Sequence, residues 1–126
     1  MFHKKLAPAY YWAIFTLFLT LSPWIPSMPT GPWNFSGQDL AAHCIFFGIQ
    51  SFLLSRGFYF QTRYPLYKKF YGSLAMTYTT LFGIFIEILQ FYHPTRYFEF
   101  FDMLADIIGA VLGYFAFRML LRYRNK

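Results

Sequence analysis

Acidic residues are the scarcest charged residues in this sequence, and charge of either sign is rare. The chain has 5 Asp and Glu against 11 Lys and Arg, and charged residues make up 13% of its 126 positions. Hydrophobic residues make up 57% and aromatic residues 25%. A soluble domain of this size needs more polar residues to cover its surface. The scarcity of charge therefore argues against an ordinary soluble domain and indicates a membrane protein.

Cysteine and polar linkers are also scarce. The single cysteine, Cys44, excludes a disulfide within the chain, and we expect its side chain to be a small buried apolar group. The run after Lys4 and Lys5 has no small-x-small cleavage pattern, so we expect a retained first helix. No repeat or long linker interrupts the sequence. We therefore predict one domain over residues 1–126.

Four apolar stretches predict the fold. They cover residues 8–22, 39–55, 70–91 and 101–121. Their lengths are at or just below the ~20 residues that cross a hydrocarbon core of ~30 Å. Within a bilayer each stretch must satisfy its own backbone hydrogen bonds, which favours helices. The prediction is an all-α, polytopic membrane protein that forms a bundle of four transmembrane helices.

The basic residues predict how this bundle is oriented. Every Lys and Arg except Arg96 lies at the same ends of the stretches, while the first connection, residues 23–38, carries no charge. These bases are Lys4, Lys5, Arg56, Arg63, Lys68, Lys69, Arg118, Arg122, Arg124 and Lys126. The positive-inside pattern places both termini in the cytoplasm of a multi-pass protein of the cell inner (plasma) membrane. We assign the net charge of +6 to contact with the lipid bilayer and predict no nucleic-acid partner.

The acids lie at the opposite ends of the stretches, together with a few other polar residues. We call this set the polar stripe, and it comprises Asp39, His43, Glu87, Gln90, Arg96, Glu99, Asp102 and Asp106. Within each stretch its members are three or four residues apart, so they share one helix face. If these faces turn inward, the side chains meet near the outer leaflet, with Arg96 and Glu99 above them in the last connection.

The polar stripe has several interpretations. In a structural network, Arg96 and His43 neutralise the carboxylates. The acids outnumber these two cations, however, and ionisable groups inside a membrane are costly, which favours a binding site. Relief then comes from proton uptake, foremost at Glu87, or from a bound cation. No tight metal motif is present, so no cofactor is predicted, although carboxylates beside a histidine suit a divalent cation.

Catalysis by the polar stripe also stays open. A carboxylate and a histidine can act as an acid–base pair. Ser36 and Cys44 lie nearby, but neither has an evident triad partner, so the catalytic residues stay unassigned.

Glycines on two of the predicted helices indicate close helix packing. Gly83 lies on the stripe face of the third stretch, and Gly109 and Gly113 are four residues apart in the last. Small residues at this spacing let another helix approach closely. The partner is either a helix of the same chain or a second copy, which would give a homo-oligomer through Gly109 and Gly113.

Three ordered blocks of residues carry a family resemblance. They read Asp39-Leu-Ala-Ala-His43, Gly83-x-x-x-Glu87-x-x-Gln90 and Arg96-x-x-Glu99-x-x-Asp102-x-x-x-Asp106-x-x-Gly109-x-x-x-Gly113. In this order and with short gaps, they resemble the VanZ-like family of small bacterial membrane proteins. That family usually has Lys where this chain has Leu40, and often Asn at the position of Asp106. Without that Lys, less positive charge is available to balance the negative charge of the carboxylates.

The resemblance implies a link to antibiotic resistance, because the family is named for a protein connected with resistance to teicoplanin, a lipid-tailed glycopeptide. With the polar stripe, it favours binding of a cell-envelope lipid or an amphiphilic, lipoglycopeptide-like ligand, with aromatic residues such as Phe46 and Phe47 beside the acyl chain. The alternatives are an intramembrane enzyme acting on a lipid-linked substrate and a structural charge network without a ligand. A transporter is less favoured, since no ionisable residue is predicted at mid-depth.

Overall fold

Helices make up most of the chain where its structure is described. The computed structural model describes residues 2–21, 36–92 and 100–125. The helices are α1 (Phe2–Leu21), α2 (Ser36–Phe60), α3 (Pro65–Lys69), α4 (Tyr71–Phe91) and α5 (Phe100–Arg124), and these ranges contain no strand. The all-α prediction is confirmed.

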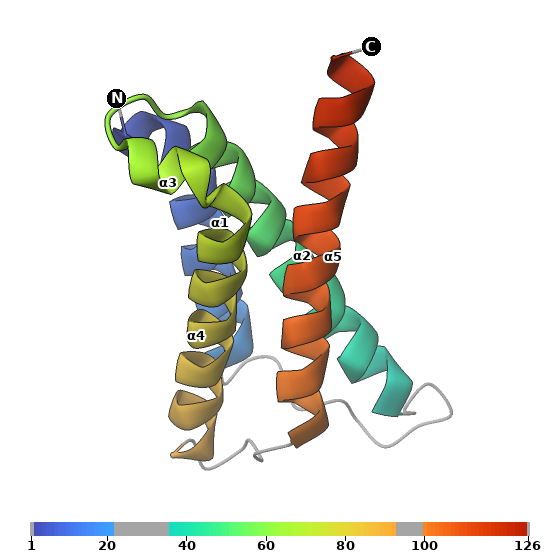
Figure 1. Cartoon of the computed structure of the whole chain (residues 1–126). Helices are drawn as coiled ribbons and strands as arrows, with labels where there is room; N and C mark the ends of the chain where they lie inside the picture. The colour runs from blue at the N-terminus through green and yellow to red at the C-terminus, as the bar shows by residue number, and fades with distance from the viewer. Residues whose placement is uncertain (1, 22–35, 93–99, 126) are drawn as a thin grey trace.

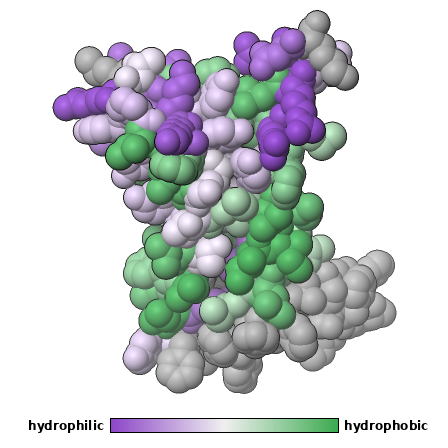
Figure 2. Space-filling view, viewed as in Figure 1, coloured by the Kyte–Doolittle hydropathy of each residue, from purple (hydrophilic) through white to green (hydrophobic). Residues whose placement is uncertain are grey.

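Both termini and α3 lie at the same end of the bundle (Figure 1). We call it the basic end, because Lys4, Lys5, Lys68, Lys69 and the bases of the last turns of α5 are placed there. The hydrophilic side chains on the visible face gather at this end, while hydrophobic side chains dominate below them (Figure 2). The opposite end, where α2 and α5 begin and α1 and α4 finish, is called the far end.

Two of the described helices are long and apolar enough to cross a membrane. They are Tyr71–Leu89 in α4, with a mean hydropathy of 1.4, and Met103–Arg124 in α5, with 1.7. The long helix α2 carries Gln50, Ser51 and Ser55, which lower its mean hydropathy but are buried inside the protein. The polar side chains of α2 therefore face other helices, as polar groups in membrane proteins usually do. The hydropathy of the described residues supports a membrane protein and leaves four spans as a prediction.

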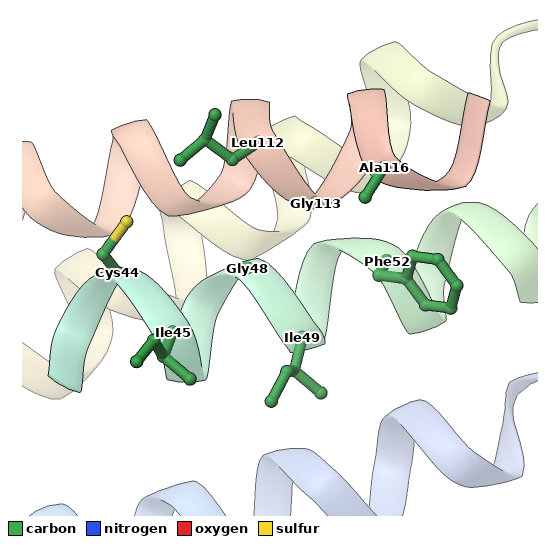
Figure 3. Close-up of a pocket in the computed structure, with 8 residues that line it drawn as sticks. All are labelled: Cys44, Ile45, Gly48, Ile49, Phe52, Leu112, Gly113 and Ala116. Carbon is green, nitrogen blue, oxygen red and sulfur yellow. The ribbon is translucent and has the colours of Figure 1, made fainter. Parts of the chain in front are cut away.

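Helices α2 and α5 form the most extensive contact in the structure, and glycines make it possible. A Cβ atom at Gly109 would collide with the carbonyl oxygen of Cys44, and one at Gly113 would collide with that of Gly48. Figure 3 shows Gly48 and Gly113 on the facing sides of the two ribbons. The Ser51 hydroxyl also donates a hydrogen bond to the carbonyl oxygen of Ala110 at 2.6 Å. Within the chain, α2 is thus the helix that approaches these glycines, while a homo-oligomer stays untested.

The first helix packs on the opposite side of α2. Leu6 and Ala9 of α1 are buried in one cluster with Leu54 and Phe58 of α2 and Ala75 of α4. The Trp12 indole N–H donates a hydrogen bond to the carbonyl oxygen of Phe46 at 2.9 Å. Because α1 contacts both α2 and α4, it closes the side of the bundle away from α5.

The helices extend beyond the apolar stretches that predict them. Helix α1 begins at Phe2 rather than at residue 8, and α5 ends at Arg124 rather than at 121. Backbone hydrogen bonding continues into polar residues at the basic end, whereas hydropathy marks only the apolar part of each helix. The predicted bounds concern the membrane-spanning stretches rather than the helix ends, and they stay a prediction.

The end of α2 shows a similar difference. The helix ends at Phe60 rather than at residue 55, because Gly57 and Phe58 are buried there. The buried Gln61 side chain then closes the turn: its Nε2 donates to the carbonyl oxygen of Tyr64 at 2.7 Å, and its Oε1 accepts from the Tyr64 N–H at 2.8 Å. Pro65 begins α3, a position that suits its missing N–H.

Replacing Gly113 by Ala tests the glycine-based packing of α2 on α5. The added Cβ meets the Gly48 backbone, which cannot move as a flexible side chain could. We expect a destabilisation of about 1–3 kcal/mol, as for other overpacked sites. Thermal unfolding in mild detergent measures it, with Ile108→Ala, an exposed position on α5, as the control. Equal unfolding temperatures for the two variants would contradict the packing described here.

Candidate functional site

Three residues of the polar stripe meet between α2, α4 and α5, near the far end. They are His43, Glu87 and Asp106, and one nitrogen or oxygen ligand atom from each lies within 4.8 Å of the other two. His43 Nδ1 and Asp106 Oδ1 are 2.8 Å apart, which is a hydrogen bond and an ion pair when the imidazole is protonated. Glu87 is 1% exposed and Asp106 is 2% exposed. We call these three residues the polar cluster.

The imidazole of His43 is held in place by an aromatic neighbour on its own helix. Its ring stacks on that of Phe47, with centroids 6.1 Å apart and an interplanar angle of 3°. Phe47 is buried and packs in turn against Phe82 of α4, at 5.9 Å between centroids. The stack fixes the ring plane, so that Nδ1 points towards α5 and its carboxylate.

The Asp106 carboxylate occupies space that a glycine of α4 leaves open. A Cβ atom at Gly83 would lie 2.7 Å from Asp106 Oδ2, closer than such atoms can approach. This oxygen is fully buried and has no hydrogen-bond partner among the described residues. A buried carboxylate oxygen without a partner is unfavourable by about 1–3 kcal/mol or more. Gly83 thus leaves room for the Asp106 carboxylate, in addition to allowing close packing of the helices.

Glu87 completes the polar cluster from α4. It lies one turn after Gly83 on the same helix, so both face α5. Two carboxylates close together in a dry interior repel each other when both are ionised, and the His43 imidazole supplies at most one positive charge. The cluster can therefore hold a proton, bind a cation, or accept hydrogen bonds from a polar ligand.

The other members of the polar stripe lie where their side chains are not described. Asp39, Gln90 and Asp102 belong to α2, α4 and α5, and only their backbone is described. Arg96 and Glu99 lie outside the described residues. The prediction that they join the same site stays a prediction.

An apolar groove adjoins the α2–α5 contact and was not foreseen from the sequence. Its volume is about 370 Å³, and it is lined by Cys44, Ile45, Gly48, Ile49, Phe52, Leu112, Gly113 and Ala116 (Figure 3). It begins at Cys44, the residue after His43, and follows α2 towards the basic end. Cys44 is half-buried at its edge. The four-residue spacing of Cys44, Gly48 and Phe52 is the signal that sequence reasoning missed.

The comparisons with known proteins identify one family. Residues 6–122 match the family model described as VanZ/LLP1, a range that includes every residue of the polar stripe. No curated protein and no solved structure matches the chain.

Proposed function

This chain belongs to the VanZ/LLP1 family, and from that premise we propose that its polar cluster binds the headgroup of a cell-envelope lipid or of a lipid-tailed amphiphile. One observation carries the proposal: the carboxylates of Glu87 and Asp106 are buried next to the half-buried His43 in the interior of the bundle. Burying two carboxylates is costly in a membrane protein, and such groups usually have a functional role. A ligand with a cationic or hydrogen-bonding headgroup offsets this cost.

The apolar groove supplies the second half of an amphiphile site. From Cys44 to Phe52 it runs along roughly 12 Å of helix, at ~1.5 Å per residue. That length suits a section of an acyl chain, which gains free energy from burial against Ile49 and Leu112. The groove begins one residue after His43 in the sequence but is lined by none of the three residues of the polar cluster, so we propose it as the site of the acyl tail alone.

The proposed location is the outer leaflet of the cell inner membrane. Four spanning helices, α1, α2, α4 and α5, with both termini in the cytoplasm agree with the basic end that the termini and α3 share (Figure 1). Lys68 lies over the Tyr59 ring at 5.6 Å and Arg124 over the Phe60 ring at 5.8 Å, as in an interfacial belt of bases and aromatics. The polar cluster then faces the cell envelope.

We further propose that this binding contributes to antibiotic resistance, an expectation that family membership supports. A protein that captures a lipid-tailed glycopeptide in the outer leaflet lowers the amount that reaches its target. A protein that captures an envelope lipid changes the surface to which such a drug inserts. In both cases the chemistry is recognition and requires no bond to be broken.

A second candidate function is an intramembrane enzyme acting on a lipid-linked substrate. The observation that favours it is the His43–Asp106 pair, because a carboxylate that orients an imidazole is a recurrent general-base arrangement. Glu87 would then hold or relay the proton. Turnover of a lipid-linked substrate by the purified protein would distinguish this function from binding alone.

The topology is tested by labelling single cysteines in intact cells. In a Cys44→Ser background, a cysteine placed at Arg63, exposed between α2 and α3, should react only after the inner membrane is permeabilised. A cysteine placed at Thr30, in the uncharged first connection, should react without permeabilisation. The reverse pattern, or labelling of both positions from one side, would refute the proposed orientation.

Glu87→Gln tests ligand binding. Native mass spectrometry of the detergent-purified protein, incubated with a bacterial polar lipid extract or with teicoplanin, should show a retained adduct on the wild type. Loss of the charge should weaken it by about tenfold or more, since hydrogen bonds to charged groups contribute about 1.5–3 kcal/mol. Thr79→Val, a buried change on the same helix, is the control and should keep the adduct. A bare wild-type spectrum, or equal adducts on both variants, would contradict the proposal.

A further inference from the structure

The polar cluster has the donor atoms of a metal site. An imidazole nitrogen and two carboxylate oxygens reach it from three different helices, all within 4.8 Å of one another. Ligand atoms that share an ion about 2.1 Å away lie roughly 3–4 Å apart. The His43–Asp106 separation of 2.8 Å already approaches this value, and the third ligand, Glu87, has a flexible side chain that can close the remaining gap. Small side-chain rotations therefore suffice to form the site.

Asp106 provides an independent sign that a ligand is accommodated. Its Oδ1 is bonded to His43, but its Oδ2 is buried without a hydrogen-bond partner among the residues that the structure describes. The side chain is 2% exposed, and Gly83 is the residue that leaves room for this oxygen. The hydrogen bond to His43 provides a partner for Oδ1 of Asp106 but none for Oδ2. A bound cation would give the Oδ2 oxygen a partner as well, because a carboxylate can coordinate a cation through its second oxygen.

Charge balance determines the valence of the cation. Ionised Glu87 and Asp106 contribute two negative charges, and a neutral His43 contributes none. A divalent ion makes the assembly neutral, which is the favoured state in a medium of low dielectric constant. A monovalent ion would leave a net charge buried beside apolar helices.

The donor set determines the type of ion. We propose that His43, Glu87 and Asp106 bind one divalent transition-metal ion, Zn²⁺ or Mn²⁺. An imidazole ligand favours these ions over Mg²⁺ and Ca²⁺, which prefer oxygen, and three protein ligands are few for Ca²⁺. Three ligands also leave at least one coordination position for water or for an oxygen of a bound headgroup. The inference does not depend on the proposed lipid ligand.

The test uses the metal alone, with the full chain purified in detergent and stripped with a chelator. Isothermal titration with Zn²⁺ and Mn²⁺ should show one ion per chain for at least one of them, and binding should raise the unfolding temperature. His43→Gln and Asp106→Asn should each weaken binding at least about tenfold, the lower end of what loss of a supporting residue costs a metal site. His3→Ala, which removes a histidine at the basic end, should bind as the wild type does.

A second measurement does not require the site variants to fold. In His3→Ala/His93→Ala, the only histidine left of the three in the chain is His43. X-ray absorption at the edge of the bound ion should show imidazole scattering in this variant. Absence of that signal, lack of stoichiometric binding of both ions, or undiminished affinity in a folded His43→Gln would each overturn the proposal. Failure of lipid binding with intact metal binding would affect only the proposed function.

Discussion

The contact between His43 and Asp106 joins α2 to α5 in the polar interior, and the placement of the other site residues depends on it. The hydrogen bond of 2.8 Å forms only because the two helices approach to backbone contact at Gly109 and Gly113. The same approach brings Ser51 to the carbonyl oxygen of Ala110. With α5 fixed in this way, Gly83 admits the Asp106 carboxylate to α4, and Glu87 of α4 completes the polar cluster.

This arrangement also explains why, among the described residues, α4 and α5 contain stretches apolar enough to cross a membrane and α2 does not. Its polar residues, among them Gln50 and Ser51, point into the protein, where they are buried. A helix surrounded by other helices can carry such groups, whereas one exposed to lipid cannot. Polar groups concentrated on one central helix make the bundle interior suitable for a headgroup or an ion, while hydrophobic side chains dominate the visible face below the basic end (Figure 2).

The sequence predicts the helices and the composition of each helix face, but only part of the geometry between them. Hydropathy and spacing place His43, Glu87 and Asp106 on helix faces, since the period of a helix is fixed. The sequence does not show which carboxylate bonds to His43, because that choice depends on how α2 is rotated against α5. The rotation follows from glycine contacts across the two helices. Similarly, Gln61 closes the turn before α3 through contacts that hydropathy does not encode.

A double-mutant cycle between His43 and Asp106 tests the central claim most directly. The free energy of unfolding in detergent is measured for the wild type, His43→Ala, Asp106→Ala and the double variant. If the two side chains form one unit, their effects are not additive, and we expect a coupling free energy of about 1–3 kcal/mol. Additive effects, within about 0.5 kcal/mol, would show that the two residues act independently and would contradict the account of this site.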